Sequence, residues 1–99
     1  MSVRGPLVSV VSPLYNEGDG VDRFVARIAD VLGEAGLRYE IVLVDDGSTD
    51  GSWARVVHHG RLDDRVRGVR LSRNFGKEAA VLAGLEHANG DAVVVIDAD

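Results

Sequence analysis

The stretch EIVLVDDGSTDGSW, residues 40–53, decides the fold of this chain. It opens with a continuous apolar run that stops at two adjacent aspartates. A continuous run, as opposed to an alternating one, is typical of a strand buried on both faces of a parallel sheet. The Gly, Ser, Thr and Asp residues that follow supply turn and helix-cap chemistry before Trp53 opens a helical pattern. The stretch therefore predicts a buried strand, a turn and a helix, in that order.

The same succession repeats on either side of this stretch. Residues 7–12 and 92–96 are further near-continuous apolar runs, whereas residues 66–71 alternate, which favours a strand nearer an edge. Apolar residues at helical spacing lie between these runs: Val21, Phe24, Val25, Ile28 and Leu32; Val56 and Val57; Val81, Leu82, Leu85 and Ala88. Strands that alternate with helices indicate right-handed crossovers and a parallel sheet. We therefore predict an α/β fold of order β-α-β-α-β-α-β.

Composition narrows the class of protein. The 99 residues allow one small domain, and 45% hydrophobic with 27% charged residues is typical of globular proteins. A net charge of −5 argues against nucleic acid as the main partner, because phosphate backbones select basic surfaces. The lack of cysteine excludes disulfides and thiolate metal sites. No apolar run approaches the ~20 residues that span a bilayer, so we expect the chain itself to be cytoplasmic.

The ends of the predicted strands carry the candidate site residues, because ligands of open α/β sheets bind at the carboxyl ends of strands. After the first strand, Pro13, Tyr15, Asn16 and Glu17 offer a stiff exit, an aromatic face, an amide and a carboxylate. The alternative is an ordinary helix start, with Asn16 or Asp19 as the N-cap and Glu17 complementing the helix dipole.

The next two strand ends carry charged residues. Asp45 and Asp46 must point to opposite faces, so one can face the crevice while the other points away or caps a helix. The alternative is a solvated turn. After the third strand, Arg73 and Lys77 flank Gly76 at a helix start, where free N–H groups and cationic side chains suit a diphosphate. The alternative there is an exposed basic loop.

The last strand ends in IDAD, residues 96–99. Residues two apart in an extended chain point to the same face, so Asp97 and Asp99 would direct both carboxylates at one point. Such a pair suits Mg²⁺ or Mn²⁺, and the alternative is a polar strand exit. Together the strand ends describe a nucleoside diphosphate site. The chain lacks G-x-G-x-x-G and G-x-x-x-x-G-K-[ST], which argues against a nicotinamide-dinucleotide fold and a P-loop NTPase.

Three segments that carry these motifs are VSVVSPLYNEG, YEIVLVDDGSTDGSW and RLSRNFGKEAAVLAGLEHANGDAVVVIDAD. They resemble the N-terminal half of the glycosyltransferase family 2 domain, which has the GT-A fold. Within them, RNFGKEAAVLAGL is most similar to the polyprenyl-phosphate glycosyltransferases, such as bactoprenol glucosyltransferases and dolichol-phosphate mannose synthases. The resemblance runs from about residue 7 to residue 99. It implies a Rossmann-like parallel sheet with strand order 3-2-1-4.

The resemblance also implies which residues hold the nucleotide. Pro13, Tyr15 and Glu17 would contact it. Val44 and Asp46 would read the base, with Asp46 as the partner of a uracil or guanine edge.

Further roles are implied for the diphosphate and the metal. Arg73 and Lys77 would lie near the diphosphate. Asp97 and Asp99 would be the D-x-D pair, catalytic through the Mg²⁺ or Mn²⁺ that they bind, with Asp99 bonding the metal most directly. The backbone of Ala98 would touch the nucleotide.

The implied reaction is metal-dependent transfer of a sugar from a UDP- or GDP-sugar to a polyprenyl phosphate, dolichyl or undecaprenyl. The acceptor phosphate oxygen would attack the anomeric carbon with inversion. The metal would neutralise charge on the leaving diphosphate.

Family members continue beyond the D-x-D pair, so we expect residues 1–99 to be the donor-binding half of a domain cut after this motif. Alone, this half would be inactive, and other segments would make any contact with the cytoplasmic face of a membrane. One alternative is a non-catalytic nucleotide-binding module. Another is a phosphoacceptor domain that uses Asp45 and Asp46. An open sheet edge would also allow two copies to pair as a homo-oligomer.

Overall fold

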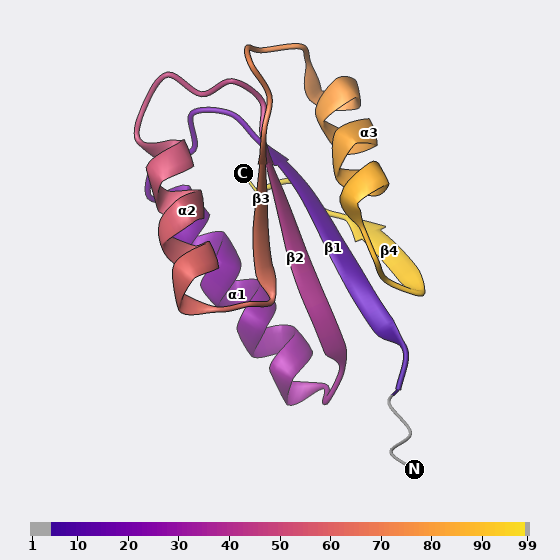
Figure 1. The fold of residues 1–99 in the computed structure, drawn as a ribbon. Helices are drawn as coiled ribbons and strands as arrows, with labels where there is room; N and C mark the ends of the chain where they lie inside the picture. The colour runs from indigo at the N-terminus through magenta and orange to yellow at the C-terminus, as the bar shows by residue number, and fades with distance from the viewer. Residues whose placement is uncertain (1–4, 99) are drawn as a thin grey trace.

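The computed structural model describes residues 5–98 and contains seven alternating elements. They are β1 (Leu7–Leu14), α1 (Gly20–Glu34), β2 (Arg38–Asp45), α2 (Ser52–Leu62), β3 (Val66–Arg70), α3 (Lys77–His87) and β4 (Ala92–Val95). The strands form one parallel sheet in the order β3-β2-β1-β4 (Figure 1). The predicted α/β class, the order of the elements and the implied strand order are confirmed.

Helices cover the sheet on two faces, and β2 lies between them. α1 and α2 pack on one face and α3 on the other (Figure 1). Ile41 and Leu43 of β2 belong to the apolar cluster under α1 and α2, whereas Val42 and Val44 belong to the cluster under α3. All four side chains are fully buried. This two-sided burial is the reason why the apolar run of β2 is continuous.

Small residues let α3 lie close to the sheet. Ala80 and Gly84, one helical turn apart, are the buried positions of this helix. A Cβ atom on Gly84 would lie 2.3 Å from Cγ1 of Val11 and 3.0 Å from Cγ2 of Val44. The absence of a side chain at Gly84 therefore sets the distance between α3 and the central strands.

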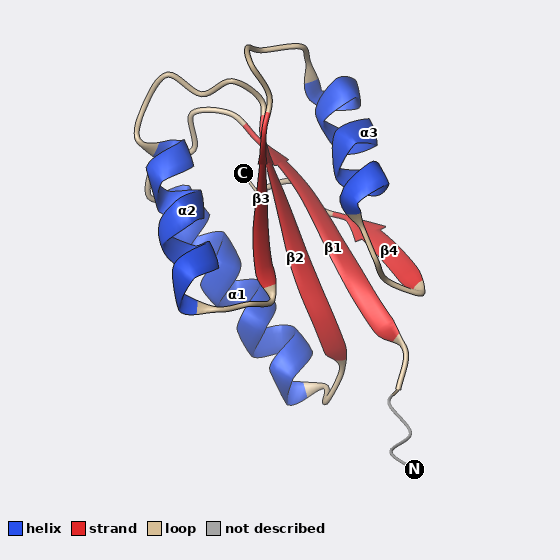
Figure 2. Ribbon diagram, in the orientation of Figure 1, coloured by secondary structure: helices blue, strands red, loops and turns tan. Residues whose placement is uncertain are grey.

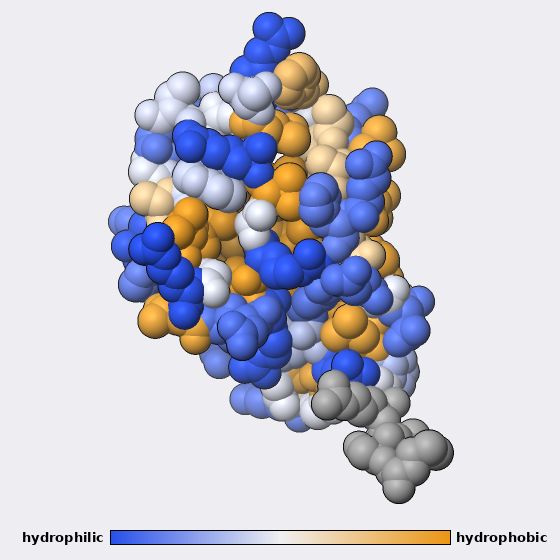
Figure 3. Space-filling model, in the orientation of Figure 1, coloured by the Kyte–Doolittle hydropathy of each residue, from blue (hydrophilic) through white to orange (hydrophobic). Residues whose placement is uncertain are grey.

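The prediction that residues 92–96 are buried on both faces is wrong. Within residues 5–98, β4 is an outer strand that pairs with β1 alone, and Val93, Val94 and Val95 are 41%, 45% and 46% exposed. The reason is that α3 packs over β1 and β2 and leaves β4 largely uncovered. Leu82 and Leu85 of α3 are exposed as well. On the side of the molecule where α3 lies, hydrophobic residues reach the surface among hydrophilic ones (Figure 3). The prediction of β3 as an edge strand is confirmed.

A network around Glu40 joins the amino ends of the strands to the end of α3. The Glu40 carboxylate accepts hydrogen bonds from Oγ of Ser9 at 2.5 Å, from the Asn89 N–H at 2.6 Å, and from two nitrogens of Arg67 at 2.9 and 3.2 Å. Arg67 also donates to the His87 carbonyl. We call these groups the Glu40 network.

The loops that follow β1, β2 and β3 all lie at the opposite end of the sheet, at the top of Figure 2. This end holds the candidate site. None of the helices between residues 5 and 98 combines the length and the apolar character needed to cross a membrane.

Candidate functional site

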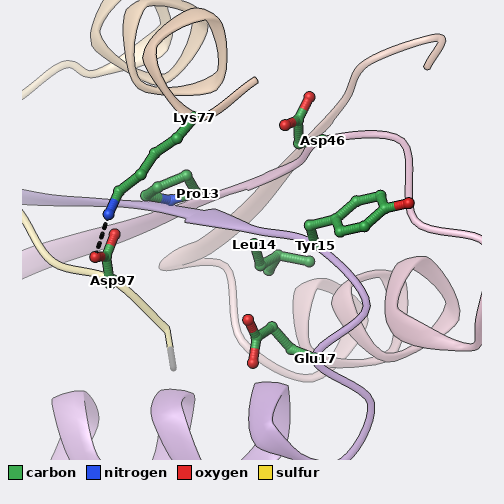
Figure 4. Close-up of a pocket in the computed structure, with 7 residues that line it drawn as sticks. All are labelled: Pro13, Leu14, Tyr15, Glu17, Asp46, Lys77 and Asp97. Atoms are coloured by element: carbon green, nitrogen blue, oxygen red, sulfur yellow. Dashed lines mark hydrogen bonds and ion pairs between the residues drawn. The ribbon is translucent and has the colours of Figure 1, made fainter. Parts of the chain in front are cut away.

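A pocket of about 220 Å³ opens where β1, β2 and β4 end (Figure 4). We call it the strand-end pocket. Its lining residues are Pro13, Leu14, Tyr15, Glu17, Asp46, Lys77 and Asp97. Every one of them except Leu14 is a predicted site residue. Leu14 is the last residue of β1, and only its position between Pro13 and Tyr15 in the sequence could have indicated it.

An ion pair spans one side of the strand-end pocket. Nζ of Lys77, at the start of α3, contacts Oδ2 of Asp97, which follows β4 (Figure 4). Both side chains are exposed to solvent, so water weakens their attraction. A ligand phosphate or a cation entering the pocket would therefore exchange partners with this pair at little cost.

Asp46 lies on the other side of the pocket and joins two loops. Its Oδ1 accepts a hydrogen bond from the Phe75 N–H at 2.8 Å, and its Oδ2 accepts one from the Gly76 N–H at 3.1 Å. A carboxylate offers about four acceptor sites. Asp46 can therefore hold the loop before α3 and still accept a hydrogen bond from a ligand.

Asp45 points to the opposite face, as the alternation of a strand requires. It is fully buried, and its Oδ1 accepts hydrogen bonds from both N–H, at 3.2 Å, and Oγ–H of Ser48. Oδ2 has no hydrogen-bond partner within residues 5–98 and lies 3.9 Å from Nε of Arg70. Because Asp45 and Asp46 are both buried, the alternative of a solvated turn is wrong for these two residues, whereas Thr49 and Asp50 are exposed as that alternative requires.

The loop after β1 is bound to the loop after β2. The Asn16 N–H donates to Oγ of Ser48 at 2.8 Å, and Oδ1 of Asn16 accepts from the Thr49 N–H at 2.8 Å. Asn16 adopts a left-handed backbone conformation, with φ of 51°, which asparagine tolerates better than most residues. Asp19 is the N-cap residue of α1, and its carbonyl accepts from the Asp22 and Arg23 N–H groups, but its side chain makes no cap hydrogen bond. The alternative in which Asp19 caps α1 is therefore confirmed for its position in the helix and not for its side chain, and the alternative in which Asn16 does so is wrong.

A second contact continues this junction toward α2. The Gly18 N–H donates to Oγ of the fully buried Ser52 at 3.0 Å, and the Ser52 N–H donates to Oδ1 of Asp50 at 2.8 Å. Hydrogen bonds from Ser52 hold the pKa of Asp50 below its ordinary value. Asp50 therefore stays charged at the start of α2, where a negative charge is favourable.

The loops after β2 and β3 are also in direct backbone contact. Gly47 has φ of 76°, and a Cβ atom there would lie 2.3 Å from the carbonyl carbon of Arg73 and 2.4 Å from the nitrogen of Asn74. No other residue type fits at Gly47 without separating the two loops. The three loops are therefore one interlocked unit.

Arg73 lies outside the strand-end pocket. Its guanidinium lies 5.0 Å from the centre of the exposed Phe75 ring, and it lines a neighbouring groove of about 660 Å³. Tyr15 lines both the groove and the pocket. The two cavities are therefore adjacent and meet at Tyr15.

Two other predicted residues, Val44 and Ala98, do not line the pocket, and a third lies outside the described residues. Val44 is fully buried and its side chain packs under α3, so this residue has no surface open to the pocket. Ala98 packs against the apolar cluster under α1 and α2. Asp99 lies outside the described residues, so its pairing with Asp97 stays a prediction.

The donor chemistry of the pocket fits a hard cation. The carboxylates of Glu17, Asp46 and Asp97 are oxygen donors of the kind that Mg²⁺ and Mn²⁺ prefer. Residues 5–98 contain no group of three or more His, Asp or Glu side chains placed to hold an ion by themselves. Any cation here would therefore take one or two protein carboxylates and draw its other ligands from phosphate oxygens or water.

The comparison with protein families is decisive. The family model for Glycosyl transferase family 2 matches residues 9–99. The chain belongs to this family. An undecaprenyl-phosphate 4-deoxy-4-formamido-L-arabinose transferase of Edwardsiella ictaluri is 45% identical over 94 residues, which cover 93% of this chain and 29% of that protein. An uncharacterized glycosyltransferase of Synechocystis is 42% identical over 92 residues, with 93% and 29% covered. The chain thus spans less than a third of these relatives.

Two solved structures share this fold. The mannosyltransferase PcManGT from Pyrobaculum calidifontis, solved in complex with GDP-Man and Mn²⁺, matches with a TM-score of 0.79 and 30% identity over 99% of this chain and 28% of that chain. The S. aureus protein TarS 1-349, solved in complex with UDP, matches with a TM-score of 0.73 and 26% identity. That match covers 93% of this chain and 27% of TarS 1-349.

Proposed function

We propose that the protein transfers a sugar from a UDP- or GDP-sugar to a polyprenyl phosphate. The observation that carries this proposal is the meeting of Tyr15, Glu17, Asp46, Lys77 and Asp97, which come from separate strand ends and a helix start, in one pocket. An aromatic face, acceptors for a base or ribose, a cation and a metal-binding carboxylate are together what a nucleoside diphosphate requires. The complexes of PcManGT with GDP-Man and of TarS with UDP support this class of donor.

The base and ribose belong at the side of the pocket formed by Tyr15, Glu17 and Asp46. The Tyr15 side chain is exposed and offers a ring for stacking. Asp46 is held by two backbone N–H groups and keeps acceptor capacity for an N–H group of uracil or guanine.

The diphosphate belongs beside Lys77. This ammonium lies in the pocket at the first residue of α3 and supplies a positive charge close to the helix N-terminus. Arg73 lines the adjoining groove, which shares Tyr15 with the pocket, so in this structure it does not lie beside Lys77. The proposed sites of the base and the diphosphate thus lie at opposite ends of the pocket.

Asp97, together with Asp99, would hold the Mg²⁺ or Mn²⁺. When bound, the metal would offset negative charge on the leaving diphosphate. Lys77 contributes in the same direction from the protein side, because its ammonium lies beside Asp97. The Mn²⁺ in the PcManGT complex supports a divalent cation.

The acceptor supplies the nucleophile. An oxygen of the polyprenyl phosphate forms a bond with the anomeric carbon as the bond from that carbon to the nucleoside diphosphate breaks, with inversion. The phosphate acceptor is already anionic, which reduces the need for a general base. The name of the Edwardsiella relative supports an undecaprenyl-phosphate acceptor. Such a lipid acceptor would place the reaction at the cytoplasmic face of a membrane.

Calorimetric titration of the protein with UDP and GDP, with and without Mn²⁺, tests the donor site. We expect one of the two nucleotides to bind in a Mn²⁺-dependent manner, and Asp97→Ala to weaken that binding at least 10-fold. Asp30→Ala, an exposed aspartate on α1, is the matched control and should bind as the unaltered protein does. Failure of the folded protein to bind either nucleotide would contradict the proposal.

A further inference from the structure

We propose that Ser48 is a positioning residue for the donor site, a proposal that rests on the function proposed above. Ser48 links the buried Asp45 carboxylate to the loop that carries Tyr15 and Glu17 and so holds that loop in place. We call Asp45, Ser48 and Asn16 the loop clamp.

The first part of the loop clamp is an anchor in the core. Asp45 is the last residue of β2, lies in register with Leu14 of β1, and is fully buried. Both N–H and Oγ–H of Ser48 donate to its Oδ1. Ser48 is buried too, so these hydrogen bonds are shielded from competing water.

The second part of the loop clamp passes this anchorage to the loop after β1. A serine hydroxyl has one proton and two lone pairs. The proton of Ser48 goes to Asp45, because a carboxylate can only accept, and a lone pair accepts the Asn16 N–H at 2.8 Å. The direction of both hydrogen bonds is therefore fixed. The relay runs from the Asn16 backbone through the Ser48 hydroxyl to the Asp45 carboxylate.

The residue at the end of this relay lies between two pocket residues. Tyr15 and Glu17 flank Asn16 and line the strand-end pocket. The side chain of Asn16 binds the Thr49 N–H from the exposed side, so the loop is held at two points. Of these, the contact with Ser48 is the better shielded, because Asn16 and Thr49 are both exposed.

This arrangement orders the Tyr15–Glu17 loop before a ligand arrives. Ordering a loop during binding subtracts from the affinity, and a loop that is already ordered avoids that loss. Ser48 therefore acts on nucleotide affinity through Tyr15 and Glu17, and its hydroxyl needs no contact with the nucleotide to do so.

The test compares Ser48→Ala with Ser48→Thr and Ser12→Ala. Ser48→Ala removes the hydroxyl, whereas Ser48→Thr keeps it. Ser12 is a buried serine of β1 whose Oγ has no hydrogen-bond partner in the described part of the chain, so Ser12→Ala makes the same change without breaking the relay. Two quantities are measured in each folded variant: the hydrogen-exchange rate of the Asn16 amide, and the affinity for UDP and GDP in the presence of Mn²⁺.

We expect Ser48→Ala to speed exchange of the Asn16 amide at least 10-fold and to weaken nucleotide binding by roughly 10-fold, the equivalent of one lost hydrogen bond. Ser48→Thr should restore most of both, and Ser12→Ala should change neither. Unchanged affinity in a folded Ser48→Ala variant would overturn the positioning role. Unchanged exchange at Asn16 would overturn the relay, even in a protein that binds no nucleotide. Lack of binding by the unaltered protein would instead contradict the proposed function.

Discussion

Burial and hydrogen bonding have opposite effects on the pKa of Glu40. Burial alone would raise the pKa of Glu40, but hydrogen bonds from Ser9, from the Asn89 N–H and from Arg67 outweigh burial and lower it. A lowered pKa in the folded state means that the charged form stabilises the fold. This stabilisation is fully present above the unfolded-state value, near 4.5, and is lost as pH falls through the lower folded-state pKa.

We expect Glu40→Gln to lower the free energy of unfolding at pH 7 by about 2 kcal/mol, because charge-assisted hydrogen bonds within the Glu40 network are lost. The difference between the variant and the unaltered protein should narrow as pH falls from 4.5 through the lower folded-state pKa, where the Glu40 carboxylate becomes neutral, as the glutamine amide already is. Urea unfolding at several pH values measures this. Glu86→Gln, an exposed glutamate on α3, is the control. A difference that stays constant with pH would show that the charge of Glu40 does not stabilise the fold.

From the sequence it was possible to predict which residues lie at the site, but not which residues they hydrogen-bond to. Tyr15, Glu17, Asp46 and Lys77 could be chosen because each follows a strand or starts a helix, and parallel strands bring these positions together. The roles of Asn16 and Glu40 could not be predicted. Asn16 binds Thr49 across 33 positions, and Glu40 binds Asn89 across 49 positions. Hydrogen bonds over such separations leave no local pattern in a single sequence.

At the scale of elements, α3 contains a residue of low helical propensity, Gly84, at the position where it packs against the sheet. Glycine destabilises a helix by roughly 1 kcal/mol relative to alanine. Gly84 nevertheless lies in α3, because any side chain there would overlap Val11 and Val44. Overpacking typically costs about 1–3 kcal/mol, so at this position packing outweighs propensity.

We therefore expect Gly84→Ala to lower the free energy of unfolding by about 1–2 kcal/mol, despite the gain in propensity. The matched control is Gly33→Ala in α1, where a Cβ atom would meet nothing within 4 Å. That change should raise the stability by roughly 0.5 kcal/mol. Thermal or urea unfolding of the two variants measures both effects. Stabilisation by both substitutions would contradict the packing argument.

The succession of elements could be predicted from periodicity, but the exposure of β4 could not. Residues 92–96 have the same continuous apolar pattern as residues 41–44 of β2. The pattern reports that the side chains are apolar, and it does not report whether other elements cover them. In the structure α3 lies over β1 and β2, which covers β2 and leaves β4 exposed.

At the scale of the whole molecule, the exposed side of β4 is a candidate contact between copies of this chain. An outer strand presents unpaired backbone groups, and three exposed valines lie on it. We expect this chain to self-associate with rising concentration, and Val94→Lys to reduce the association because charge opposes edge pairing. Sedimentation velocity measures it. Leu62→Lys, which removes an exposed leucine at the end of α2, is the control. An equal effect of both substitutions would rule out β4 as the site of contact.

The interlocking of the three strand-end loops also limits how this protein can be re-engineered. Gly47 fits against the backbone of Arg73 and Asn74, and Asn16 is bound to Thr49. A single loop transplanted from a relative with another donor preference would lose at least one of these two contacts. Loops after β1, β2 and β3 must therefore be exchanged as a matched set, and natural changes of donor preference at this site should likewise involve coordinated substitutions in all three.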